Sequence, residues 1–105
     1  MDIVFHAHHA TVSEYMRRRA EAALRRLARR AGRPVDGVIR FEQDGGMRRV
    51  ELTLHAPGRR YVAHSEGRFF GTLLADALRR LSAQLDHNKR PLRARAQRRR
   101  ALTAR

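Results

Sequence analysis

The spacing of apolar residues changes twice along this chain, and these changes constrain its fold more than any other feature. Residues 16–31 and 70–85 place apolar side chains three and four positions apart, which is the spacing of one helical face. Between these segments, residues 47–56 alternate apolar and polar side chains, as a half-buried strand does. The sequence therefore predicts two amphipathic helices separated by strands.

Capping signals give the expected bounds of the two helices. Ser13 is a good N-cap for a first helix that runs to about Ala31, where Gly32 can end it. The second helix is expected over residues 67–90, because Pro91 cannot continue a regular helix. The apolar face of this second helix contains Phe70, Leu73, Leu74, Ala77, Leu78, Leu81 and Leu85.

Four strands are expected, at residues 2–6, 38–43, 47–56 and 59–65. The segments Asp44-Gly45-Gly46 and Pro57-Gly58 predict hairpin turns between the last three strands. The side chains expected to point inward are those of Ile3, Phe5, Ile39, Phe41, Val50, Leu52, Leu54, Tyr61 and Ala63.

The order of elements predicts an α+β fold with β-α-β-β-β-α topology. A helix between the first two strands implies parallel pairing, and the hairpins imply antiparallel pairing, so the four-stranded sheet is mixed. Each helix has one apolar face, so both should pack on one face of the sheet. We expect residues 1–91 to form this domain and residues 92–105, which are basic and lack acids, to form a disordered tail.

Charge is the strongest functional signal. The 105 residues include 24 Lys+Arg and 10 Asp+Glu, a formal net charge of +14. Such a balance indicates a polyanionic partner, with nucleic acid first and an anionic membrane surface second. The chain has no cysteine, no apolar stretch of membrane-spanning length and no signal-peptide pattern at its start, so we expect a cytoplasmic protein.

Basic side chains on the outer faces of both helices are the candidate binding residues. Two parallel helices carrying arginines would form one cationic surface with a groove between them, suited to RNA phosphates. A solvated helix face is the alternative, but the first helix has only Glu14 and Glu21 to pair with its arginines. The candidate residues are Arg18, Arg25, Arg26, Arg29, Arg79, Arg80, His87, Lys89 and Arg90.

Other chemistries have weaker support. His6, His8 and His9 match no metal-site spacing, so a polar loop is favoured over a metal centre. The sequence has no recognisable catalytic motif, and an RNase using His55 and His64 as acid and base is the remaining enzymatic alternative. We therefore expect no enzyme, no cofactor, no metal and no small-molecule substrate. Most of the few aromatic residues fit core positions, so no platform for stacking unpaired bases is predicted.

Two segments resemble those of a known family. Residues 7–14 read Ala-His-His-Ala-Thr-Val-Ser-Glu, similar to a Gly-His-His loop before a Val-Thr helix start. Residues 63–67 read Ala-His-Ser-Glu-Gly before a long helix, in which Arg80, Gln84, Leu85 and Lys89 match a basic pattern in kind. Over residues 2–90 the chain thus resembles the ribosome hibernation promoting factors and ribosome-associated translation inhibitors, also called sigma-54 modulation proteins.

The chain also departs from this family pattern. Ala83 stands where arginine is usual, and His87 stands where lysine or arginine is usual. Phe69-Phe70-Gly71 replaces Asp-Met-Tyr, and Ala75 replaces an acid.

The resemblance implies a short-form hibernation factor. Such a protein would bind the small ribosomal subunit and its rRNA near the decoding centre, inhibit translation in stationary phase or stress, and be monomeric off the ribosome. A structured-RNA-binding protein or RNA chaperone that acts outside the ribosome is the alternative.

Overall fold

The structure is a computed structural model that describes residues 1–34 and 36–103, with side chains described through His87. Its helices are α1 (Glu14–Ala28), a 3-10 turn η1 (Arg29–Ala31) and α2 (Phe70–Thr103). Its strands are β1 (Asp2–His8), β2 (Asp36–Asp44), β3 (Met47–Ala56) and β4 (Arg59–Gly67). The predicted β-α-β-β-β-α order is therefore confirmed.

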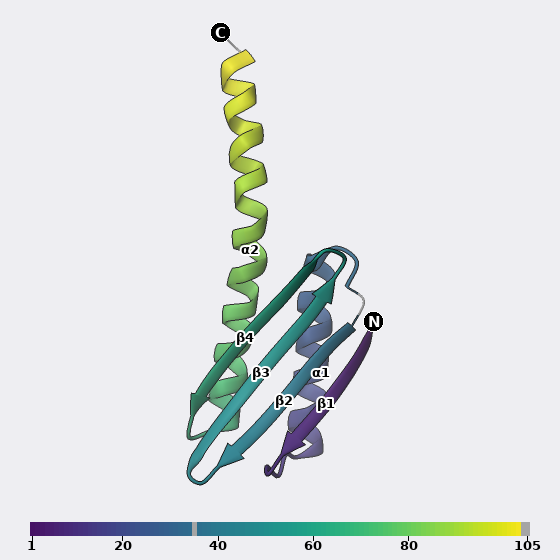
Figure 1. Cartoon of the computed structure of the whole chain (residues 1–105), viewed down its shortest axis with the longest axis vertical. Coiled ribbons are helices and arrows are strands. Elements are labelled where there is room, and N and C mark those ends of the chain that lie inside the picture. The colour runs from purple at the N-terminus through teal and green to yellow at the C-terminus, as the bar shows by residue number, and fades with distance from the viewer. Residues whose placement is uncertain (35, 104–105) are drawn as a thin grey trace.

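The four strands form one sheet in the order β1-β2-β3-β4 (Figure 1). β1 pairs with β2 in parallel, from Asp2 opposite Asp36 onward, while β2–β3 and β3–β4 are antiparallel. The glycines of the two tight turns, Gly45 and Gly58, have positive φ angles of 60° and 73°, a conformation that glycine adopts without strain. The mixed sheet predicted from the turns and the crossover is confirmed.

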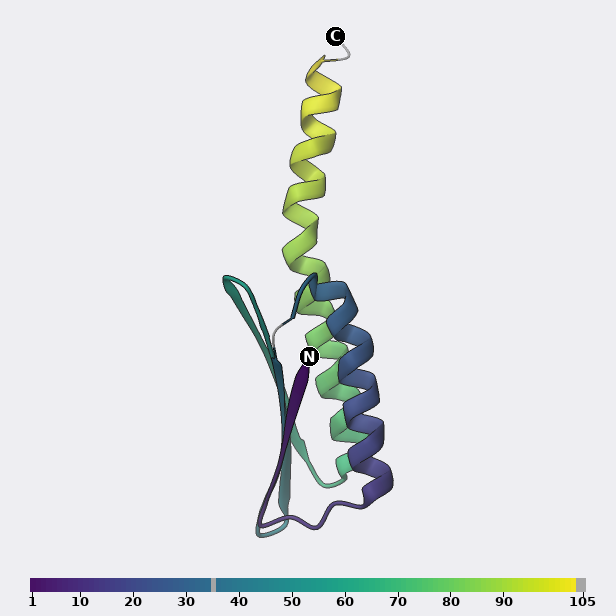
Figure 2. The same ribbon diagram turned by 90° about the vertical axis from the view of Figure 1, so that its right-hand side faces the viewer.

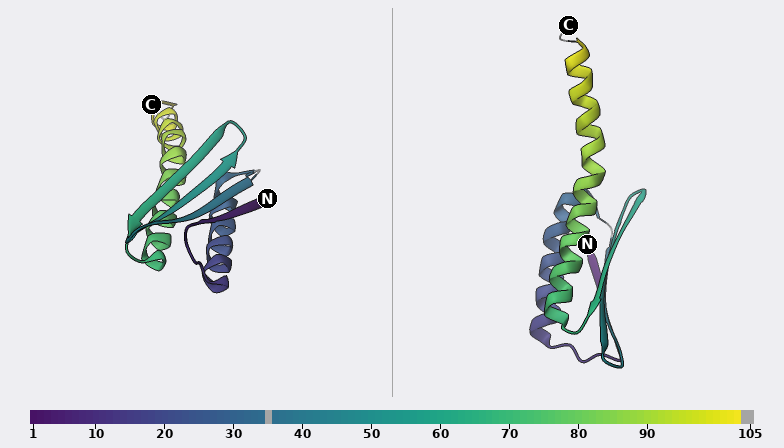
Figure 3. Two further views of the ribbon diagram at one scale, coloured as in Figure 1. Left: turned by 60° about the horizontal axis from the view of Figure 1, so that its bottom comes forward. Right: turned by 90° about the vertical axis from the view of Figure 1, so that its left-hand side faces the viewer.

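Both helices cover the same face of the sheet and run in the same direction (Figures 2 and 3). The α1 helix begins as predicted, since the Ser13 hydroxyl accepts a hydrogen bond from the backbone N–H of Met16 at 3.1 Å. Gly32 ends the helical segment at φ 87°. The opposite face of the sheet has no covering layer among the described residues, so we call it the open face.

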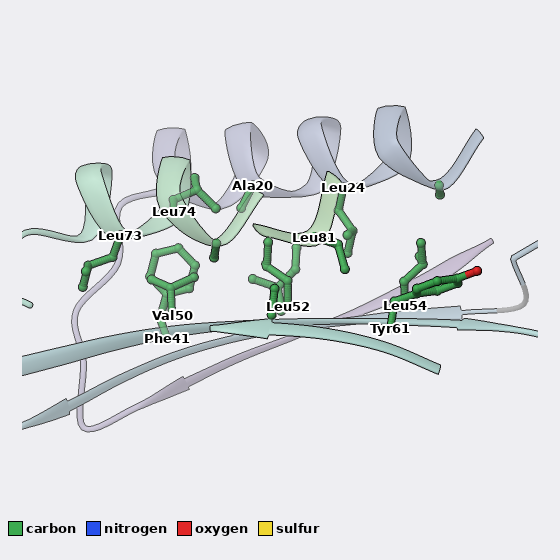
Figure 4. Packing of buried hydrophobic residues seen from close by; sticks show 14 of the residues in the cluster. Ala20, Leu24, Phe41, Val50, Leu52, Leu54, Tyr61, Leu73, Leu74 and Leu81 are labelled. Carbon is green, nitrogen blue, oxygen red and sulfur yellow. The ribbon is translucent and has the colours of Figure 1, made fainter. Parts of the chain in front are cut away.

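The core lies between the sheet and the two helices (Figure 4). From the sheet, Phe41, Leu52 and Leu54 are fully buried, and from the helices Leu24 and Leu81 meet them. Burial of a leucine or phenylalanine side chain contributes roughly 1.5–3 kcal/mol, so this contact is what holds the helices on the sheet. Sequence alternation had indicated these inward positions, but Thr53, expected to face outward to solvent, is buried on the open face by its strand neighbours.

Several element boundaries differ from the sequence expectation. β1 extends through His8, because β2 continues to offer a partner as far as Glu42. β2 and β4 are likewise longer than predicted. The predicted end of the second helix at Pro91 is wrong, since α2 continues to Thr103.

The composition of the residues after Pro91 favours the continuation of α2. A proline inside a helix removes one hydrogen bond and crowds the preceding turn. Residues 92–103 are mostly arginine, alanine, leucine and glutamine, which are strong helix formers that can offset this local cost. The division of the chain into a folded domain and a basic tail at Pro91 stays a prediction.

Candidate nucleic-acid interface

The excess positive charge is located on the helices rather than on the sheet. Residues 13–33 and 68–87, which we call the helix layer, contain eleven arginines and four acidic residues. The four strands contain five arginines and six acidic residues. Residues 88–105 add eight basic residues and no acid. The chain is therefore polarised, with a basic helix layer and a nearly neutral sheet.

A shallow groove of about 240 Å³ lies between α1 and α2. Ala23 and Leu27 of α1 and Leu78 of α2 form its floor, while Arg26 and Arg79 stand at its sides. This is the groove that the sequence predicted between two arginine-bearing helices. Arg26 and Arg29 are exposed, and neither makes an ion pair within the part of the chain that the structure describes.

Other predicted residues of the helix layer are partly engaged. Arg18 pairs with Glu14 at 3.4 Å, and Arg79 pairs with Asp76. Arg25 donates a hydrogen bond of 2.8 Å to the backbone carbonyl of Met1 and so ties α1 to the start of β1. The ion pairs are exposed and contribute at most about 1 kcal/mol each, so a phosphate can compete for these arginines.

Arg30 has a role that sequence reasoning did not assign. Its guanidinium donates to the Ser82 hydroxyl at 2.6 Å and pairs with the Asp86 carboxylate. These contacts join the end of the first helical segment to α2. Arg30 lies beside Arg29 in the sequence, yet it fixes the spacing of the two helices while Arg29 remains exposed.

Arg80 and His87 do not belong to the groove between the helices, which corrects the single surface that the sequence predicted. They line a second groove, of about 430 Å³, between α2 and β4, together with Arg60, Tyr61, Ala83 and Gln84. One residue along a helix turns the side chain by about 100°, so Arg79 faces α1 and Arg80 faces β4. The predicted residues therefore form two clusters on opposite sides of α2.

Arg80 and Gln84 also bind the edge of the sheet. Arg80 donates a hydrogen bond of 2.6 Å to the carbonyl of His64, and Gln84 donates to the carbonyl of Val62. β4 is an edge strand, whose outward backbone groups would otherwise be open to pairing with another chain. Two residues of the family-like pattern thus cover a sheet edge.

Lys89 and Arg90 lie in the continuous helix α2. Their side chains fall outside the described residues, as do those of all residues after His87. Their predicted role in binding stays a prediction.

On the open face, charged side chains pair with one another both within and across the strands. Arg49 contacts both Glu51, at 2.8 Å, and Glu66, at 3.5 Å. Arg40 lies 3.8 Å from Glu42. His55 contacts the Asp36 carboxylate of the neighbouring strand. This face therefore neutralises most of its own charge.

The histidines do not assemble into a metal centre or an acid–base pair. No group of three or more His, Asp or Glu side chains suited to a metal ion occurs among the described residues. His55 lies opposite Arg60 and His64 opposite Glu51, which separates the two histidines by roughly 13 Å along the sheet. That separation is too large for both to act on one reacting phosphate, so the geometry does not support the RNase alternative.

Sequence comparison identifies the family. The family profile described as Sigma 54 modulation protein / S30EA ribosomal protein matches residues 3–93. Because this match covers most of the chain, the protein belongs to that family. None of the curated protein sequences matches the chain at a significant level.

Two solved structures share the fold. A ribosomal subunit interface protein from Coxiella burnetii is similar with a TM-score of 0.76 and 20% identity, over 85% of this chain and 98% of that one. The N-terminal domain of Thermus thermophilus Protein Y is similar with a TM-score of 0.70 and 20% identity, over 83% of this chain and 98% of that one.

Within residues 1–34 and 36–103, neither helix offers an apolar stretch that could span a bilayer.

Proposed function

We propose that this protein is a ribosome-associated hibernation factor, which binds the small ribosomal subunit and inhibits translation in stationary phase or stress. The observation that carries the proposal is the polarised charge of the fold, with eleven arginines against four acids on the helix layer. Membership of the Sigma 54 modulation / S30EA family supports the ribosome as the partner. The similar fold of a ribosomal subunit interface protein from Coxiella burnetii also supports this partner.

The geometry of the helix layer suits the backbone of folded RNA. Base-paired RNA is recognised mainly through its shape, its phosphates and its 2′-hydroxyls. The two helices run in the same direction (Figure 3), and Arg26 and Arg79 line the groove between them, where their guanidinium groups can meet such a backbone. Arginine forms bidentate contacts with phosphate, and each phosphate that it neutralises releases counterions. We propose binding near the decoding centre, where an occupied site would block mRNA and tRNA.

The proposed rRNA contacts divide between the two sides of α2. Arg26 and Arg79 serve the groove between the helices, Arg29 is exposed just after α1, and Arg18 and Arg25 lie on the outer side of α1. Arg80 and His87 serve the groove beside β4, and Lys89 and Arg90 continue along α2. Off the ribosome, we propose a monomeric cytoplasmic protein without cofactor or membrane attachment.

Sedimentation with purified ribosomal subunits tests this function. The protein should travel with small subunits and not with large subunits alone, and its addition should lower translation of a reporter mRNA in a cell-free system. Binding to duplex RNA without enrichment on small subunits would instead favour an RNA-binding protein that acts outside the ribosome. The inactive control is a charge-reversed Arg26→Glu/Arg29→Glu variant, which keeps the core intact.

A further inference from the structure

One end of the molecule exposes three large apolar side chains together. Tyr15 is 74% exposed, Phe69 is 68% exposed and Met47 is 54% exposed. The turn between β2 and β3 and the starts of α1 and α2 all lie at this end, opposite the end to which α2 projects (Figures 1 and 2). We call it the aromatic end, and define it by Tyr15, Met47, Arg48, Arg68 and Phe69.

Most of the aromatic residues are predicted to fit core positions, and Phe41, Phe70 and Tyr61 do so. Tyr15 and Phe69 do not, because the core-facing positions next to them in the sequence are already filled by Met16 and Phe70.

Three contacts hold the chain around Phe69 in place. The Arg48 guanidinium donates to the carbonyl of Arg68 at 2.9 Å, and it lies 5.1 Å from the ring centre of Phe70. The backbone N–H of Leu73 donates to the Phe69 carbonyl at 3.1 Å, in the first turn of α2. Phe69 is thus an exposed ring on an ordered support, which lowers the entropy lost when a ligand binds it.

The two helix starts are also fixed relative to each other. The Met16 methyl group lies 3.8 Å from the position that a Cβ on Gly71 would take, so α1 and α2 approach closely at this point. Tyr15 directly precedes Met16 on α1, and Phe69 lies two residues before Gly71, just ahead of α2. The aromatic end is therefore one surface that both helices build.

Exposed rings here contribute little to folding. Four large hydrophobic side chains are more than a third exposed among the described residues, and three of them share this end. A cluster of exposed apolar groups on a small domain indicates a surface that meets a partner.

Arginines around the rings indicate what that partner is. Arg68 and Arg19 are exposed at this end, and the Arg48 guanidinium donates a hydrogen bond to the Arg68 carbonyl. Aromatic rings next to guanidinium groups match single-stranded nucleic acid, whose bases stack on the rings while its phosphates meet the arginines. We propose that the aromatic end binds an unpaired RNA base, stacked on Phe69 or Tyr15. This rests on the proposed function for RNA as the partner, and it adds a single-strand contact to the duplex-like contact of the grooves.

The test compares two probes with the same number of phosphates, a short oligoadenylate and an abasic oligonucleotide of equal length. The full chain should prefer the oligoadenylate by roughly 5-fold to 100-fold in Kd, as expected for one or two stacked bases. A Tyr15→Leu/Phe69→Leu variant, which keeps apolar surface but cannot stack, should bind both probes equally. A Tyr15→Phe/Phe69→Tyr variant should keep the preference, and Val4→Ala, on the open face, is the control for an unrelated exposed side chain.

Two outcomes overturn the proposal. One is a full chain that binds both probes equally; the other is a leucine variant, with a melting curve like that of the parent, that keeps the preference for bases. Failure of the proposed function is distinguishable, because a chain that stacks bases but does not sediment with small subunits loses only the ribosomal role.

Discussion

The helix layer and the open face of the sheet are both rich in charged side chains, but they use them in opposite ways. On the open face, Arg49 contacts one glutamate of its own strand and one of β4, and Arg40 contacts a third in its own strand, so ion pairs neutralise the charge locally. On the helix layer, Arg26 and Arg29 make no such pair within the described residues. Net charge alone therefore does not locate a binding surface, whereas the distribution of acids does.

The largest expected effect is a loss of stability, and it comes from the core between the helix layer and the sheet. Leu81→Ala should lower the free energy of unfolding by roughly 2–5 kcal/mol, because this fully buried side chain packs between α2 and the sheet. Urea denaturation measures the change. Leu78→Ala, at the half-buried floor of the groove, is the matched control and should cost less. Equal losses at the two positions would contradict the assigned orientation of α2.

Removing two arginines from the helix layer and two from the open face tests whether the position of the charge determines RNA binding. Arg26→Ala/Arg29→Ala should lower the slope of log K against log salt by about two units, since two phosphate contacts are lost. Arg40→Ala/Arg49→Ala removes the same charge from the open face and should leave that slope unchanged. Binding to small subunits over a range of salt concentrations gives both slopes. A similar fall in both variants would show that only total charge matters.

Gln84 lines the groove beside β4 but carries no charge, so its substitution tests the stability of this groove separately from its charge. Gln84→Ala should lower the free energy of unfolding by about 1 kcal/mol, because the Val62 carbonyl loses its donor. The salt slope of RNA binding should not change, since no charge is removed. His87→Ala, an exposed neighbour in the same groove, should leave stability near that of the parent. Thermal and urea unfolding measure the stability of both variants. A larger loss of stability in His87→Ala than in Gln84→Ala would contradict this assignment.

The smallest expected effect concerns an ion pair of the open face. Glu66→Gln should change the free energy of unfolding by less than about 1 kcal/mol, because the pair with Arg49 is partly exposed and Glu51 remains as a partner. RNA affinity should rise little, although the net charge increases. A strong rise would mean that the open face itself meets RNA.

The fold was largely predictable because its signals are local. The β3 bounds, Met47–Ala56, match the prediction since glycine-containing turns mark both ends of that strand. The inward faces of α1 and α2 follow from the spacing of leucine and alanine. The end of α2 was not predictable from Pro91, because helix propensity over the following residues competes with one unfavourable position.

The candidate site was less predictable than the fold, because it depends on what packs beside each residue. Arg79 and Arg80 are neighbours in the sequence, yet they serve different grooves because α1 lies on one side of α2 and β4 on the other. Periodicity identifies an outward face but not the element next to it. Likewise, the exposure of Tyr15 and Phe69 depends on the core being filled by the residues that follow each of them.

The parallel pairing of β1 with β2 has a consequence for the order in which the chain folds. The β2–β3 and β3–β4 hairpins close over short turns, with Asp44 opposite Met47 and Ala56 opposite Arg59. β1 finds its partner only across the whole of α1, since Asp2 pairs with Asp36, and closing that longer loop costs more entropy. We therefore expect the strand that is synthesised first to gain hydrogen-exchange protection last during refolding, and pulse labelling would record that order.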